Sequence, residues 1–147
     1  MNYKTLSVIA LTVLAFSCKK KPEYRGTETP VNKAVEFRIA QAGDYTAPVY
    51  DGVLAELKLT IAKENLQTGT NTVLWDTTFS MRSLRQYPAA TSPLKLTKQF
   101  NGIMESKESL RMSRIIRYMN GANNVWMNAK GESIPSLTPL SRFDISL

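Results

Sequence analysis

Alternation of apolar and polar side chains between residues 53 and 63 is the feature that most constrains the fold. Apolar side chains stand at every second position: Val53, Ala55, Leu57, Leu59 and Ile61. Successive side chains of a β-strand point to opposite faces, so these five residues would share one face. A helix would scatter them around its whole circumference. The pattern therefore predicts a strand with one buried face and one solvated face.

The same period marks other parts of the chain. It predicts further strands over residues 33–39, 72–81, 94–100, 125–129 and 143–147. The 72–81 segment is expected to carry one shared face: Val73, Trp75, Thr77, Phe79 and Met81. Asn101-Gly102 predicts a two-residue hairpin turn, because both turn positions favour residues that adopt positive φ. Ile103 and Met104 would then begin the return strand.

Residues 108–119 fit two patterns. A helix would place four apolar side chains on one stripe: Met112, Ile115, Ile116 and Met119. A strand would place another four on one face, with Arg114 as the single exception: Leu110, Met112, Ile116 and Tyr118. The helical stripe lasts barely two turns, and a short isolated helix is only marginally stable. We therefore favour the strand and keep the helix as the alternative.

Seven or eight short strands separated by turns are typical of an all-β domain. We expect one domain over residues 33–147, because about 130 residues build one core more readily than two. The favoured architecture is an antiparallel β-sandwich of the immunoglobulin-like or fibronectin III-like kind. The alternative is a small β-barrel, in which one sheet closes on itself around a ligand cavity.

Residues 1–17 have the composition of an export signal. Lys4 supplies a positive charge, and the mainly apolar run from Leu6 to Phe16 follows it. That run is too short to cross a hydrocarbon core of about 30 Å. We therefore expect a cleaved signal peptide. An ordinary secretory signal with an incidental cysteine nearby is the alternative to the interpretation that follows.

Leu14, Ala15 and Ser17 lead directly to Cys18, the chain's single cysteine. These residues resemble the lipobox of bacterial lipoproteins, and the resemblance covers only residues 1–21. It implies cleavage before Cys18, a diacylglycerol on the Cys18 sulfur, and acylation of the new amino terminus by a chain such as palmitate. In such lipoproteins an aspartate directly after the cysteine tends to keep the protein at the inner membrane. Lys19 occupies that position here, so the resemblance implies the outer membrane.

A lone thiol in an exported chain has no internal disulfide partner, so lipidation would remove a reactive group. Two or three acyl chains would anchor the protein durably, since each buried methylene contributes about 0.8 kcal/mol. Lys19, Lys20 and Lys21 would lie at headgroup level and attract anionic lipid. Residues 18–32 are polar with two prolines, and we interpret them as the lipidated cysteine and a flexible tether.

Composition excludes several classes of function. Histidine is absent, so serine-histidine catalysis, a histidine base and histidine-ligated metal are all ruled out. Removal of residues 1–17 leaves 18 basic and 12 acidic side chains, spread without blocks after the lysine run. That distribution favours a solvated surface over a nucleic-acid footprint. We expect no nucleic-acid partner, no metal, no cofactor and no transmembrane helix after the signal.

Aromatic residues are the main candidates for a ligand site. Trp126, Tyr118 and Trp75 could stack on sugar rings. Trp75 shares the core-facing set of its strand, so burial is the simpler expectation for it. In the strand predicted for residues 125–129, the Trp126 side chain points to the opposite face from Val125 and Met127. Its indole would be exposed if those two residues faced the core.

Charged residues give weaker candidates. The aspartates that could form a glycosidase-like pair are Asp44, Asp51, Asp76 and Asp144. Turn sequence explains Asp44 and Asp51 locally. An acidic-ligand patch of Arg111, Arg114 and Arg117 would be split between two faces if their segment is a strand.

Three functions remain open, and the first is favoured. The chain would be a membrane-anchored cell-envelope lipoprotein whose non-catalytic β-sandwich is a structural or interaction module, with an envelope protein or a glycan as partner. The second is a carbohydrate-binding module of a glycan-capture system, motivated by Trp126. The third, a small carboxylate-dependent hydrolase, is motivated only by the acidic residues.

Overall fold

A computed structural model describes residues 28–121 and 124–147. The expectations for the signal peptide, Cys18, Lys19, Lys20 and Lys21 lie outside the described residues. The elements are β1 Val31–Ala40, η2 Pro48–Tyr50, β2 Val53–Asn65, β3 Asn71–Ser83, η3 Leu84–Gln86, β4 Leu94–Ile103, β5 Glu108–Asn120, β6 Asn124–Ile134 and β7 Leu140–Ser146. No helix among the described residues is long and apolar enough to cross a membrane.

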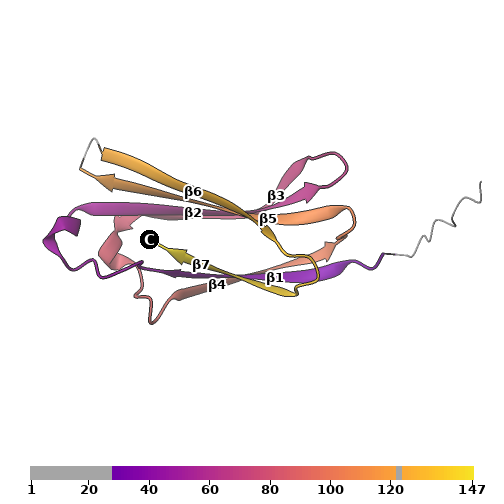
Figure 1. Cartoon of the computed structure of the whole chain (residues 1–147), viewed down its shortest axis with the longest axis horizontal. Helices are drawn as coiled ribbons and strands as arrows, with labels where there is room; N and C mark the ends of the chain where they lie inside the picture. Colours follow the sequence, from indigo (N-terminus) through magenta and orange to yellow (C-terminus); the bar gives the residue numbers. More distant parts are fainter. Residues whose placement is uncertain (1–27, 122–123) are drawn as a thin grey trace, which may run out of the picture.

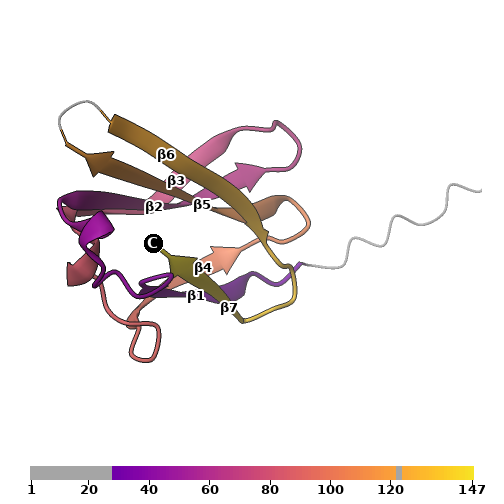
Figure 2. The same ribbon diagram turned by 60° about the vertical axis from the view of Figure 1, so that its left-hand side comes forward.

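The strands form two sheets that pack face to face (Figures 1 and 2). One sheet has the order β4-β1-β7 and the other the order β3-β2-β5-β6. All neighbouring pairs are antiparallel except β1 and β7, which run parallel. The predicted all-β sandwich is confirmed, and the described strands do not form the alternative of one sheet closed on itself. Two sheets packed face to face are the architecture that immunoglobulin-like sandwiches share.

The core lies between the sheets, and β2 occupies its centre. The alternating residues of β2 that predicted a buried face are all 5% exposed or less: Val53, Ala55, Leu57, Leu59 and Ile61. Phe37 and Ile39 of β1 cover them from the other sheet and are fully buried. Each such side chain contributes about 1.5–3 kcal/mol on burial, which explains why the clearest alternation in the sequence belongs to the central strand.

Residues 108–120 are a strand, so the helix alternative is wrong. β5 pairs with β2 on one side and with β6 on the other. Sheet pairing on both sides satisfies its backbone groups and buries Leu110, Met112 and Ile116. Arg114 occupies the same inward row, as the alternation predicted, and its Nε is buried without a hydrogen-bond partner among the described residues.

A register shift overturns the hairpin prediction at the end of β4. Asn101-Gly102 is not a hairpin turn: β4 continues to Ile103, and the reversal follows at residues 104–107. Gly102 has φ 74° and lies where the β1–β4 register shifts, so one left-handed residue produces a bulge here.

Two further register shifts divide the predicted shared face of β3. Beside Trp75, Val73 leaves the core face to become 60% exposed. Nearer the end of the strand, Arg82 instead of Met81 lies opposite the buried Ala55.

The connections gather at the two ends of the sandwich. The proximal end, where β1 begins, carries the turns at residues 66–70 and 104–107 and the loop at residues 135–139 (Figure 1). The distal end carries residues 41–52 and 84–93, the end of β5 and the start of β6. At the proximal end the Ser106 backbone N–H donates to the Glu28 carboxylate over 2.7 Å, and β1 begins at Val31, two residues before the predicted strand.

Candidate functional site

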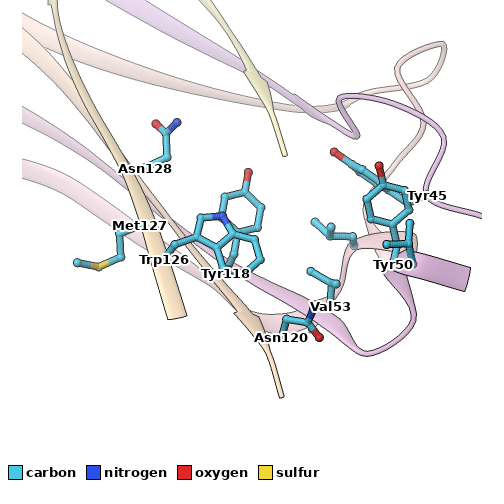
Figure 3. A pocket seen from close by; sticks show the side chains of 10 residues that line it. Tyr45, Tyr50, Val53, Tyr118, Asn120, Trp126, Met127 and Asn128 are labelled. Atoms are coloured by element: carbon cyan, nitrogen blue, oxygen red, sulfur yellow. The ribbon is translucent and has the colours of Figure 1, made fainter. Parts of the chain in front are cut away.

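An open cleft of about 580 Å³ lies at the distal end of the sandwich. Its lining is mainly aromatic and aliphatic with two amides: Tyr45, Val49, Tyr50, Val53, Leu84, Tyr118, Asn120, Trp126, Met127 and Asn128. Figure 3 shows Trp126 and Tyr118 on one side of the space and Tyr45 and Tyr50 across from them. The residues come from the β1–β2 connection, η3 and the ends of β2, β5 and β6.

Trp126 and Tyr118 form one wall of the cleft. They are register partners on β6 and β5, and their rings stack with centroids 5.2 Å apart and planes 15° apart. Their row of the sheet faces the core side, because Tyr118 is also paired with the buried Ala55 of β2. Trp126 nevertheless stays 48% exposed.

The exposure of Trp126 follows from the unequal sheets. β6 is an outer strand of a four-stranded sheet that packs on a sheet of three. Its inward row after Trp126 is largely polar and accessible: Asn128, Lys130 and Glu132. An edge strand with such a row lies outside the apolar core. One face of the Trp126 indole therefore packs on Tyr118, and the rest of its exposed surface is accessible to a ligand.

The opposite wall is the segment of residues 41–52, which carries Tyr45 and Tyr50. Their rings meet edge to face with centroids 4.8 Å apart, and the Tyr45 hydroxyl donates to the Leu147 carbonyl. Arg85 holds the segment, because its guanidinium donates to the Tyr45 carbonyl over 2.7 Å and to the Thr46 carbonyl over 2.9 Å. Arg85 also pairs with Asp51 at 2.5 Å. This wall is a fixed loop on the sandwich.

Among the described residues, those that line the cleft carry no ionised group at neutral pH. Partial burial raises the pKa of Tyr118 and the pKa of Tyr45 above the usual tyrosine value, so both remain protonated. The Tyr118 hydroxyl and the Trp126 indole N–H are neutral polar groups of this lining. Together with the amides of Asn120 and Asn128, they offer neutral donors and acceptors beside aromatic faces.

The structure revises the argument that singled out Trp126. Val125 and Met127 do not face the core but lie on the outer face of the sheet, 52% and 68% exposed. The Met127 side chain points away from the cleft in Figure 3. Trp126 is accessible because β6 is an edge strand, which alternation within a single strand does not reveal.

Trp75 is not part of this cleft. It lies on β3, the opposite edge of the sheet, and three strand spacings of about 4.8 Å separate β3 from β6. Its ring stacks on Phe37 at 5.6 Å, and the Lys98 ammonium sits 5.4 Å from its centroid. The structure thus brings Trp126 and Tyr118 together and leaves Trp75 with the core, as its strand pattern predicted.

Sequence reasoning missed Tyr45 and Tyr50. Nothing in the chain links residues 45–50 to residues 118–126, so sequence patterns assign no role to these two tyrosines. The signal that existed was two tyrosines within six residues of a segment otherwise rich in turn residues. Long aromatic side chains in loops that a rigid scaffold positions are common in binding sites.

The charged candidates do not form a site. Each predicted aspartate has a local partner: Asp44 accepts from the Thr46 N–H, Asp51 pairs with Arg85, Asp76 with Lys58 and Asp144 with Arg38. None of them lines the cleft. Arg111 and Arg117 face outward and pair with glutamates of β2, whereas Arg114 faces inward. Within the described ranges, no cluster of acidic residues could hold a metal ion.

Comparison with protein-family models, with curated proteins and with solved structures found no match to this chain.

Proposed function

We propose that the protein is a membrane-anchored, non-catalytic binding module of the cell envelope and that its cleft holds a neutral glycan. The observation that carries this proposal is the composition of the cleft. Aromatic faces and amides line it, and no charged side chain in the described part of the chain does. The C–H faces of sugar rings stack on aromatic rings, and sugar hydroxyls exchange hydrogen bonds with amides and phenols.

The size of the cleft suits a short glycan segment. Small-molecule sites are typically about 300–1,000 Å³, lined mainly by apolar and aromatic side chains with a few polar groups. A cleft of about 580 Å³ lies within that range. It is open to solvent, so a longer polysaccharide could enter with its chain continuing on either side. The fixed Tyr45–Tyr50 wall lowers the entropy cost of binding.

The proposed anchor is acylated Cys18, with Lys19, Lys20 and Lys21 against anionic headgroups of the outer membrane. The position of the cleft supports this arrangement. The chain enters the domain at the proximal end, and the cleft lies at the distal end (Figure 1). The 13 residues of β2 between the two ends span about 40 Å. An anchor at the proximal end would hold the cleft away from the bilayer.

A binding role fits the chemistry of the cleft better than the hydrolase hypothesis does. Glycoside hydrolysis needs two carboxyl groups about 5–10 Å apart at the scissile bond. The cleft lining has no carboxylate, and the four candidate aspartates lie on β3, β7 and the β1–β2 connection.

Capture of an envelope protein is the second candidate. The observation that favours it is the outer face of the β5–β6 pair, where Ile115, Val125 and Met127 are 41%, 52% and 68% exposed. An accessible apolar face on an edge strand suits a protein partner. Val125→Lys should abolish such an interaction and leave glycan binding intact, because Val125 is not part of the cleft lining.

Calorimetric titration against a panel of neutral polysaccharides tests the glycan proposal. We expect binding by the wild type and a loss of at least about fivefold in Trp126→Ala, because stacking on an indole is worth about 1–3 kcal/mol. Trp75→Phe is the matched control and should bind like the wild type. Equal affinity in Trp126→Ala and the wild type would exclude the cleft as the site.

Metabolic labelling with radioactive palmitate tests the anchor. The wild type should incorporate label, and Cys18→Ala should incorporate none. An unlabelled wild type, or equal label on both proteins, would refute lipidation of Cys18.

A further inference from the structure

The three connections at the proximal end form one surface. The Leu66 N–H donates to the Lys107 carbonyl over 2.8 Å, which joins the turn of residues 66–70 to the turn of residues 104–107. The Leu137 N–H donates to the Glu105 carboxylate over 3.0 Å, which joins the loop of residues 135–139 to the same turn. These bonds hold the tips of three connections in fixed relative positions.

Two leucines project from this surface. Leu137 is 90% exposed and Leu66 is 53% exposed. Leu137 has φ 61°, the only positive φ of a non-glycine residue in the described part of the chain. That conformation is unfavourable for a leucine, and the Glu105 carboxylate maintains it by accepting the Leu137 N–H. The fold therefore holds a large apolar side chain out in solvent.

The charges around these leucines are mostly neutralised within the domain. Lys33 pairs with Glu105 at 2.5 Å, Lys63 with Glu108 at 2.7 Å, and Arg111 with Glu64 at 3.3 Å. Most charges of this end face are paired, and leucines project from it. Its transfer to the boundary between lipid headgroups and acyl chains would therefore have a low desolvation cost.

We propose that the proximal end of the sandwich rests on the lipid bilayer, with Leu137 and Leu66 inserted at the headgroup boundary. This inference depends on the proposed acylation of Cys18. Glu28 is ten positions after Cys18, so the two Cα atoms are at most about 35 Å apart. Glu28 is bound to Ser106 in the proximal turn, so the anchor would keep these leucines facing the membrane. A lipid surface is thus the partner that the path of the chain brings to them.

Site-specific fluorescence tests the contact. Cys18 is the only native cysteine, so in acylated protein Leu137→Cys provides a single free thiol for a polarity-sensitive dye. The full mature chain is placed in vesicles of phosphatidylethanolamine and phosphatidylglycerol, and acylation of Cys18 is verified by intact mass on the same sample. Thr91→Cys, exposed in the distal connection of residues 84–93 and outside the cleft, is the control.

We expect the dye at position 137 to emit at shorter wavelength than the dye at position 91 and to be quenched by nitroxide-labelled lipid. Leu66→Cys should behave like Leu137→Cys. Water-like, unquenched emission at positions 137 and 66 in acylated, vesicle-bound protein would overturn the membrane contact and leave the anchor intact. A free Cys18 sulfur in native protein that does not associate with vesicles would refute the anchor and the contact with it.

Discussion

Lys33 and Glu105 form an ion pair, with Nζ and Oε1 2.5 Å apart and the lysine side chain only 4% exposed. The Lys33 ammonium also donates to the Pro135 carbonyl over 2.8 Å. One buried cation on β1 thereby fastens the β4–β5 turn and the β6–β7 loop, both of which cross between the sheets. Breaking a buried pair leaves an uncompensated charge, so this contact matters to the whole proximal end.

The pair predicts a pH dependence of stability. Hydrogen bonds from Lys33, and next from the Leu137 N–H, lower the pKa of Glu105 below its usual value. A folded-state pKa below the unfolded one means that the unfolded chain binds the proton more tightly. The Glu105 contribution is therefore full above about pH 4.5 and is lost as the pH falls through the folded-state pKa. In thermal unfolding followed from pH 6 to pH 3, Glu105→Gln should lower the midpoint at pH 6 and flatten its dependence on pH. Parallel curves for the variant and the wild type would contradict this.

Leu57→Ala tests the core that alternation predicted. Leu57 is fully buried in the central strand. We therefore expect the Leu57→Ala variant to lose about 2–5 kcal/mol of unfolding free energy, because apolar burial is lost and a cavity remains. Leu66→Ala is the control, because Leu66 is 53% exposed and should cost no more than about 0.5 kcal/mol. Urea unfolding measures both. Similar losses in the two variants would mean that the core is misplaced.

Gly102→Ala tests the bulge that replaces the predicted hairpin. Gly102 has φ 74°, and an added Cβ would meet no atom within 4 Å, so any cost is conformational. We expect a loss of about 1–2 kcal/mol. Gly43→Ala is the matched control: its surroundings are equally open and its φ is not in the positive region, so it should be neutral or slightly stabilising. Unfolding midpoints that coincide for the two variants would argue against a left-handed residue at position 102.

Arg85→Ala tests the fixed wall of the cleft. The guanidinium binds the carbonyls of Tyr45, Thr46 and Ala47 and pairs with Asp51, and the residue is exposed. We expect weaker glycan binding, by about threefold to tenfold, because Tyr45 and Tyr50 lose their fixed positions. The midpoint of thermal unfolding should change little. Arg142→Ala is the control, since Arg142 is an exposed arginine of β7 outside the cleft. Equal affinity for Arg85→Ala and Arg142→Ala would exclude a role for the wall.

The alternation of apolar and polar residues predicted those features of the fold that depend on a single strand. It identified the buried face of β2, the inward row of β5 with Arg114 as its exception, and the association of Trp75 with the core. These results follow from the two-residue period, which assigns each side chain to a face wherever one face is buried.

The remaining features depend on pairing between distant segments. The bulges at Val73 and Gly102 arise from register shifts between strands, which no single strand encodes. The meeting of Tyr45 and Tyr50 with Tyr118 and Trp126 requires the strand order of both sheets. Trp126 and Tyr118 could be named from the sequence as aromatic candidates. The reason why Trp126 is accessible, and the wall of Tyr45 and Tyr50, required the fold.

Fluorescence titration of Trp75→Phe tests the central claim most directly. The chain has two tryptophans, so this variant reports Trp126 alone, and Trp126→Phe reports Trp75 alone. With a neutral glycan that binds the wild type, we predict a saturable change in Trp126 emission at the calorimetric affinity and no change in the emission of Trp75. An unchanged Trp126 signal at a glycan concentration that saturates the protein would contradict binding in the cleft.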